Sequence, residues 1–209
     1  MRTTIKLGLT ALMAAILLAS ALSTTSARNL ELFNSVNWRV TWSRLEFQSS
    51  LAILLRCQVT LEGSFHSRTI PKVARLLMGA ITRIDIKENC TSGSARPERP
   101  PPWHLTYEGF TGRLPTIETV RLLIQRFQFA IIVMGVTCKY GTPTDNVTVD
   151  ARVNLTSEIT SITPTRSRNI VSLLEGSLIC PATGTLVSGT GDGSVTLLNT
   201  TTRIRVTLI

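Results

Sequence analysis

The sequence Pro100-Pro101-Pro102-Trp103-His104-Leu105-Thr106-Tyr107-Glu108-Gly109-Phe110-Thr111-Gly112-Arg113-Leu114-Pro115 decides the fold class of this chain. Prolines open this stretch, and a glycine and a proline close it, around the densest aromatic run of the chain. Alternation places two sets of residues on opposite faces of an extended segment, namely Trp103, Leu105 and Tyr107 against His104, Thr106 and Glu108. We therefore predict a central β-strand that is entered from a stiff proline loop.

The same alternation recurs on both sides of this stretch. Between Ala52 and Phe65, Cys57 and every second residue after it are apolar or small, and from Val147 to Leu155 apolar residues alternate with polar ones. Asp192-Gly193 is a typical hairpin-turn dipeptide. We count about nine or ten short strands separated by turn signals, so the predicted fold class is all-β, an antiparallel sandwich or a barrel.

Three segments are less regular. Pro71 to Met78 begins with proline and has apolar residues at helical spacing, which favours a short helix. Ile117 to Gln128 fits a helix or a strand equally well, so the fold has room for one or two short helices. Phe129 to Cys138 is apolar on both faces, and we expect a single interior strand there.

Residues 1 to 27 have the pattern of a secretory signal peptide. Arg2 and Lys6 precede an uncharged apolar run, and the small residues that follow offer cleavage after Ala21 or after Ala27. The run is short for a membrane span, so we expect no span once this leader is removed. The expected product is a single secreted β domain of residues 28 to 209, located outside the cell or in the cell envelope.

The four cysteines predict two disulfide bonds. Cys57, Cys90, Cys138 and Cys180 are widely spaced and form no CxxC motif, and an exported chain meets an oxidising compartment. Four cysteines allow three pairings, and the sequence does not choose among them. Our preference is Cys90 with Cys138 and Cys57 with Cys180, because the first of these bonds would bracket the central stretch.

The charge of the chain is basic but dispersed. A formal net charge of +9 becomes +7 when the two basic residues of the leader are removed. The remaining Lys and Arg are scattered singly, so we expect a solvated surface and no specific nucleic-acid site. A polymer of the cell envelope, or another anionic polymer, is the binding partner that such a charge favours.

The central stretch also holds the candidate ligand-binding residues, Trp103, His104, Tyr107 and Glu108. Aromatic rings of this kind can form a sugar-binding platform, although in a chain with 5% aromatic residues they more often form core. The alternative is a secreted hydrolase that uses His104 or His66. A strand separates His104 from Glu108 by roughly 13 Å, which prevents a direct hydrogen bond, and no GxSxG motif is present. We therefore predict a non-catalytic binding or structural module.

The sequence offers no motif for a cofactor or a metal ion. Two histidines are too few for a His-rich site, and the run from Gly191 to Ser194 lacks the spaced acidic ligands of a calcium loop. No Walker or dinucleotide glycine pattern occurs. We expect neither a cofactor nor a metal.

Two stretches carry a resemblance to a known group of proteins. They are Cys57-x-Val59-Thr60-Leu61-x-Gly63-Ser64-Phe65-His66-Ser67 and Trp103-His104-x-x-Tyr107-x-x-Phe110-x-Gly112-x-Leu114-Pro115. Together they resemble small secreted β-rich proteins of actinomycete-type bacteria whose activity is not characterised. The resemblance covers about the middle half of the chain and implies a bacterial exported β-rich domain, but it carries over no catalytic residues. In a bacterium, the Asn-x-Ser/Thr sequences at Asn89, Asn146, Asn154 and Asn199 would not carry the glycans of the eukaryotic secretory route.

Overall fold

The computed structural model describes residues 29–51, 54–88, 90–113, 116–142, 144, 146–165, 169–188 and 193–208. Within these ranges all regular structure is β-strand, and no helix occurs. The expected leader, Asn89, Asp192 and the end of the central stretch at Leu114-Pro115 lie outside the described residues.

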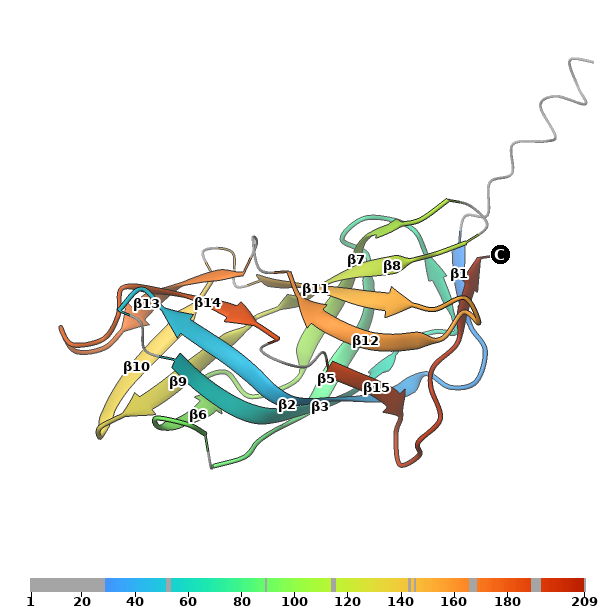
Figure 1. The fold of residues 1–209 in the computed structure, drawn as a ribbon. Helices are drawn as coiled ribbons and strands as arrows, with labels where there is room; N and C mark the ends of the chain where they lie inside the picture. Colours follow the sequence, from blue (N-terminus) through green and yellow to red (C-terminus); the bar gives the residue numbers. More distant parts are fainter. Residues whose placement is uncertain are drawn as a thin grey trace, which may run out of the picture.

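Eight antiparallel strands form a closed barrel, so the predicted all-β barrel or sandwich is a barrel (Figure 1). Closure depends on β15, which pairs with β12 on one side and with β2 on the other, where Val195 lies opposite Val40. Around the barrel the strands are β2 (Asn37–Ser49), β3 (Leu54–Phe65), β5 (Leu77–Ile86), β7 (Trp103–Thr111), β8 (Thr119–Gln125), β11 (Asn146–Val153), β12 (Ile159–Pro164) and β15 (Gly193–Leu197).

Five further strands continue the sheet beyond the barrel, and we call them the extension. They follow one another from the distal half of β2 in the order β14 (Thr183–Val187), β13 (Ile170–Glu175), β10 (Val136–Gly141), β9 (Gln128–Val133) and β6 (Ser94–Pro97). A separate small sheet at the other end of the molecule contains β16 (Val206–Leu208), β1 (Asn29–Leu32) and β4 (Thr69–Pro71).

The chain passes repeatedly between the barrel and the extension. β8 of the barrel is followed by β9 of the extension, β10 by β11, β12 by β13 and β14 by β15. The β2 strand itself crosses the boundary, because Val40 pairs with β15 whereas Phe47 pairs with Leu186 of β14. We call this boundary the junction. In each of the four pairs of successive strands named above, one strand ends and the next begins near the junction, whereas β2 continues across it.

The central stretch forms β7, as predicted. Trp103, Leu105 and Tyr107 are 2–3% exposed and belong to the core, which confirms the alternation. The Trp103 indole donates a hydrogen bond to the carbonyl oxygen of Arg99 at 3.0 Å, so the preceding loop is anchored to the first residue of the strand. β7 pairs with β5 and β8, which makes it an interior strand of the barrel.

The predicted helix from Pro71 to Met78 is wrong. Residues 72–76 form a turn, and β5 starts at Leu77. Arg75 has a left-handed φ of 65°, and its amide donates to the carbonyl oxygen of Tyr107 in β7. This amide is therefore not available for a hydrogen bond within a helix. Val73 and Leu76 are 57% and 39% exposed, so the apolar face of such a helix has no packing partner.

The other differences concern short elements and one hairpin. The described residues form sixteen strands where we expected nine or ten, partly because four of these strands have only three or four residues. Phe129 to Cys138 is the β9–β10 hairpin, in which Val133 lies opposite Val136. Ile117 to Gln128, which the sequence left open, contains β8 and the first residue of β9.

The predicted pairing of the cysteines is also wrong. Cys57 is bonded to Cys90, and Cys138 to Cys180. The bracketing argument fails because each bond joins segments that are neighbours in the fold. The segment before β6 lies against β3, where Arg56 forms a β-bridge with Thr91, and Cys138 of β10 lies beside the loop that follows β13. Two disulfides are compatible with an extracellular or otherwise oxidising environment.

Removal of one disulfide tests this arrangement. We expect Cys138→Ala with Cys180→Ala to lower the free energy of unfolding by about 2–4 kcal/mol, because the bond closes a long loop in the unfolded chain. The bond spans 42 residues and the Cys57–Cys90 bond spans 33, so the matched variant at Cys57 and Cys90 should lose a similar amount. Denaturant titration measures both losses. A peptide map of the unreduced protein that joins Cys90 to Cys138 would contradict the structure.

The packing of β3 against β5 is tested at a glycine. A Cβ added at Gly63 would collide with the carbonyl oxygen of Ala80 and with the Trp38 ring, whereas one added at Gly109 meets nothing within 4 Å. We expect Gly63→Ala to lower the free energy of unfolding by about 1–3 kcal/mol. The matched control Gly109→Ala should stay within about 0.5 kcal/mol of wild type in the same chemical denaturation.

Candidate functional site

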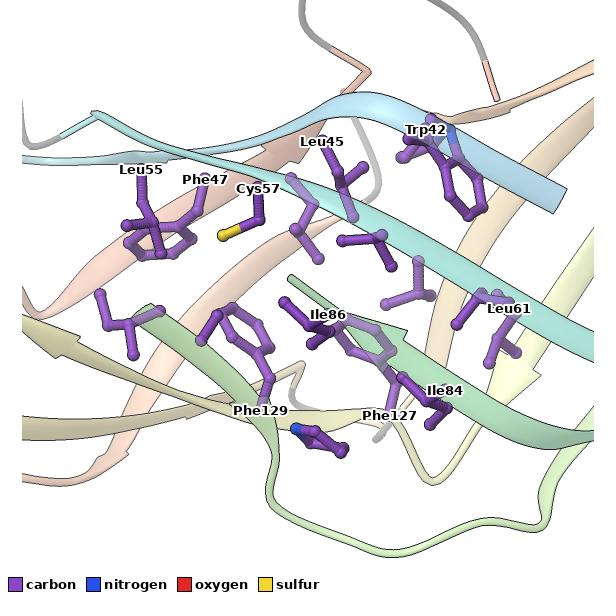
Figure 2. Close-up of a pocket in the computed structure, with 18 of the residues that line it drawn as sticks. Trp42, Leu45, Phe47, Leu55, Cys57, Leu61, Ile84, Ile86, Phe127 and Phe129 are labelled. Carbon is purple, nitrogen blue, oxygen red and sulfur yellow. The ribbon is translucent and has the colours of Figure 1, made fainter. Parts of the chain in front are cut away.

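An apolar cavity of about 80 Å³ lies at the junction between the barrel and the extension (Figure 2). All twenty residues that line it are of apolar types, including the disulfide-bonded Cys57. Leu55, Cys57, Val59 and Leu61 supply one wall, because alternate residues of β3 point inward. From Leu55 to Leu61 this wall is about 20 Å long at ~3.3 Å per residue, so the lining extends along β3 for that length.

Aromatic rings form the wall opposite β3. Trp103 and Phe127 meet edge to face with ring centroids 5.1 Å apart, and Phe127 lies 5.5 Å from Phe129. Phe129 in turn contacts Phe47 of β2 at 5.6 Å. These contacts connect the first residue of the central strand to β9 and β2, and they fix the rings in offset and edge-on arrangements that are favourable for aromatic pairs.

The polar atoms of the lining residues point away from the cavity. The indole nitrogen of Trp42 donates to the carbonyl oxygen of Ile162 at 3.0 Å, and the indole nitrogen of Trp103 donates to the carbonyl oxygen of Arg99. Because both N–H groups are already hydrogen-bonded to the backbone, the cavity presents carbon on nearly all sides. A site of this composition favours apolar ligands, since it offers water no hydrogen-bonding partners.

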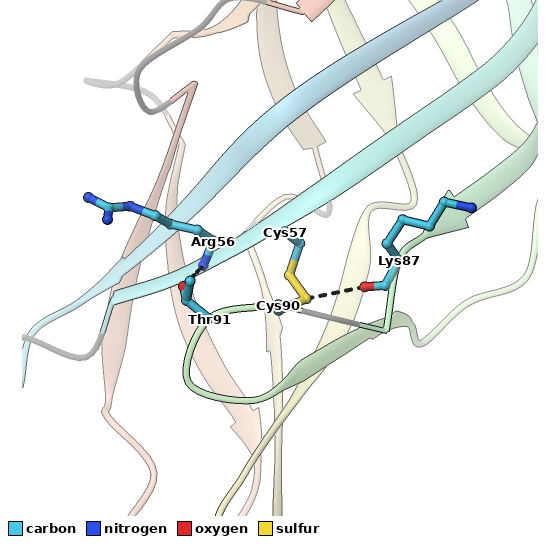
Figure 3. The surroundings of a disulfide bond; sticks show 5 residues. All are labelled: Arg56, Cys57, Lys87, Cys90 and Thr91. Atoms are coloured by element: carbon cyan, nitrogen blue, oxygen red, sulfur yellow. Dashed lines mark hydrogen bonds between the residues drawn. A yellow bond between two sulfur atoms is a disulfide. The ribbon is translucent and has the colours of Figure 1, made fainter.

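Cys57, which lines the cavity, forms a disulfide bond with Cys90. Figure 3 shows the surroundings of this bond. Beside this disulfide, two hydrogen bonds join Arg56 to Thr91. The Arg56 amide donates to the Thr91 hydroxyl at 3.0 Å, and the Thr91 amide donates to the Arg56 carbonyl at 2.9 Å. The Lys87 carbonyl oxygen lies 3.5 Å from Cys90 Sγ. The loop before β6 is therefore fixed against β3.

An ion pair between the buried Glu46 and the partly exposed Arg56 joins β2 to β3 on the face opposite Phe47 and Leu55. Glu46 is 5% exposed, and Arg56 donates to it at 2.7 Å while Gln48 donates at 3.2 Å. Burial raises the pKa of Glu46, but the hydrogen bonds from Arg56 and Gln48 and the charge of Arg56 outweigh it, so the pKa is lowered overall. The lowered pKa means that Glu46 is present as the carboxylate, which pairs with the positive charge of Arg56.

The structure separates the four ligand-binding residues that the sequence suggested. Trp103 lines the cavity, whereas Tyr107 is buried further along β7 in the barrel, where burial raises the pKa of its phenol. His104 and Glu108 are half-buried and alternate with these inward residues. Only Trp103 of the four is therefore brought to the cavity. Of its aromatic neighbours, Phe127 lies in the segment that the sequence left open, and Phe129 begins the segment for which we expected an interior strand.

Neither histidine lines the cavity. His66 is exposed just beyond β3, and His104 is half-buried on β7. Nowhere in the described ranges do three or more His, Cys, Asp or Glu side chains gather as they would around a metal ion.

A second, polar cleft of about 300 Å³ lies on the outer face of β2, β3 and β5. Its charges are paired with one another: Arg39 with Glu62 at 2.6 Å, Arg83 with Glu62 at 3.7 Å, and Lys87 with Asp85 at 3.4 Å. Such a balanced surface gives an anionic polymer little net attraction, so the apolar cavity is the stronger candidate site.

No protein-family model, curated protein sequence or solved structure matches this chain. Among the described residues, no helix has the length and apolar character needed to cross a bilayer.

The pH dependence of stability tests the aromatic wall. Tyr140, which stacks on Phe129 at 5.8 Å, is fully buried and donates to the Pro181 carbonyl, and burial raises the pKa of its phenol to about 12. The unfolded phenol ionises near 10, so its contribution to stability is complete below pH 10 and is lost as the pH rises from 10 to about 12.

We expect Tyr140→Phe to be less stable than wild type at pH 8, because the hydrogen bond to Pro181 is lost. The variant should then lose less stability than wild type between pH 10 and about 12, as measured by urea denaturation across that range. Equal alkaline losses in both proteins would show that the phenol of Tyr140 is not the group that titrates.

Proposed function

We propose that this protein is an exported, non-catalytic binding module that holds a single hydrocarbon chain in the junction cavity. The observation that carries the proposal is the wholly apolar lining that extends along β3. In line with the resemblance of the sequence, the source we propose is bacterial, and the place of action is outside the cell or in its envelope.

The dimensions of the cavity favour a chain over a ring system. Pockets for drug-sized ligands measure roughly 300–1,000 Å³, and this cavity is far smaller while following about 20 Å of strand. An unbranched acyl or alkyl chain matches that combination of length and width. The lining offers no partner for a charged head group, so in the bound state the head group stays outside the cavity.

A binding role is better supported than a purely structural one. Protein interiors are close-packed, and an apolar void forfeits contacts between the side chains around it. The aromatic wall and the Cys57–Cys90 bond hold such a space open at the one place where the barrel and the extension meet. A ligand that fills the space would restore those contacts.

Quenching of tryptophan fluorescence by brominated stearic acid tests the proposal, because Trp42 and Trp103 both line the cavity. We expect saturable quenching of the wild-type protein. Val59→Phe should weaken binding at least about tenfold, because the ring takes the place of the chain and removes most of its apolar contact. The variant should stay within about 1 kcal/mol of wild-type stability, since the added volume enters a cavity.

Two further variants keep the result interpretable. Val73→Phe makes the same substitution at a residue that is 57% exposed, and it should bind as wild type does. Ala95→Leu, a smaller change in the same cavity lining, replaces Val59→Phe if the latter fails to fold. Absence of quenching in the wild type, or equal loss in Val73→Phe, would contradict a ligand in this cavity.

A further inference from the structure

Large apolar side chains project into solvent from the loops at the far end of the extension. Leu51 is 64% exposed, Met134 95%, Leu178 104% and Ile179 62%. They belong to the β2–β3 turn, the β9–β10 hairpin and the loop between β13 and β14. We call these four residues the distal tips.

The register of the strands places the distal tips at one end of the sheet. Ser49, near the end of β2, lies opposite Gly184 at the start of β14, and Ser172 of β13 lies opposite Thr183. Glu175 at the end of β13 lies opposite Lys139 of β10, and β10 begins at the β9–β10 turn. The loop that follows β13 and the β9–β10 turn therefore lie at the same end of the sheet. Figure 1 shows these connections gathered at the end of the extension, away from β1 and the small sheet.

The β9–β10 turn presents its methionine at a conformational cost. Met134 and Gly135 both have positive φ, 52° and 79°, as in a two-residue hairpin turn that favours Asn or Gly at its first position. A methionine there combines an unfavourable backbone conformation with an apolar side chain that is almost fully in water. Neither feature helps the isolated protein to fold, which indicates that the side chain is used in an interaction.

The loop that carries Leu178 and Ile179 is fixed in place. Cys180 follows directly and is bonded to Cys138 of β10, and the Cys180 amide donates to the Ser177 carbonyl at 2.9 Å. The apolar side chains are therefore displayed by a braced loop and do not have to be ordered when they bind. Preorganisation of this kind reduces the entropic cost of association.

We propose that the distal tips dock the protein on a lipid bilayer by entering its interfacial region. Protein interfaces are continuous and close-packed, with about 800 Å² buried on each partner, whereas these four side chains project from three separate loops, of which one carries the adjacent pair Leu178 and Ile179. A deformable lipid surface accommodates separate apolar projections, and the net charge of the chain, which is +9 in full and +7 without Arg2 and Lys6 of the leader, favours anionic head groups. This inference does not depend on whether the junction cavity holds a ligand.

Co-sedimentation with vesicles of equal parts phosphatidylglycerol and phosphatidylcholine tests the proposal. All proteins are prepared with the same N-terminus, so any contribution of residues 1–28 is common to them. We expect wild type to sediment with the vesicles. Met134→Ser should weaken partitioning about tenfold, and addition of Leu178→Ser should weaken it about a hundredfold, because each change removes one buried side chain from the lipid.

Leu155→Ser is the matched control. Leu155 is 96% exposed in the β11–β12 connection, at the opposite end of the barrel, and its replacement should leave partitioning unchanged. A direct readout comes from Met134→Trp, whose added fluorescence should shift to the blue with vesicles, whereas that of Leu155→Trp should not. Since the three native tryptophans, Trp38, Trp42 and Trp103, are buried, the difference spectrum reports the new residue.

Three outcomes would overturn the proposal. The first is a wild-type protein that stays in the supernatant with these vesicles. The second is a loss of partitioning in Leu155→Ser equal to that in the distal-tip variants. The third is a concentration-dependent dimer that disappears with Met134→Ser and Leu178→Ser, which would assign the distal tips to contact between two copies of the chain.

Discussion

The structure depends on the pairing of one edge of β2 with two different strands. Trp38 to Thr41 pair with β15 and close the barrel, whereas Glu46 to Ser49 pair with β14 and begin the extension. The change of partner coincides with a register shift against β3 between Trp42 and Leu45. Since a bulge bends a strand and increases its twist, β2 can leave the barrel wall at this point without losing its pairing with β3.

The cavity follows from that geometry. Where β2 changes partner, residues before and after the bulge, Trp42, Leu45 and Phe47, all face the same interior space. The barrel wall and the extension separate at this point of the sheet, and side chains from β3, β7 and β9 line the space between them. The two indole N–H groups among the lining residues are bonded to backbone carbonyl oxygens, that of Trp103 to Arg99 and that of Trp42 to Ile162. The site is therefore a consequence of topology, and its apolar character is a consequence of which side chains alternate inward.

The sequence predicted the elements whose periodicity was unbroken. Alternation along the central stretch and along β3 is a direct effect of pleating, so the strands and their buried faces were found. Interruptions were not found, because they depend on backbone details such as the left-handed φ of Arg126, which separates β8 from β9, and that of Met134 in the β9–β10 turn. The cavity was missed for the same reason. The alternation of the central stretch marks Trp103 as an inward residue, whereas Phe127 and Phe129 reach the cavity because β8 ends at Gln125 and β9 begins at Gln128.

The position of the disulfides reflects the difference between a closed and an open sheet. A closed barrel has no free edge, whereas the extension ends at β6, whose one partner strand among the described residues is β9. The Cys57–Cys90 bond and the bridge from Arg56 to Thr91 join the segment before that edge strand to β3. The Cys138–Cys180 bond ties the longest described loop of the extension to β10. Both covalent bonds thus lie where hydrogen bonding between strands is incomplete, and sequence spacing could not reveal this because it contains no information on which edge stays open.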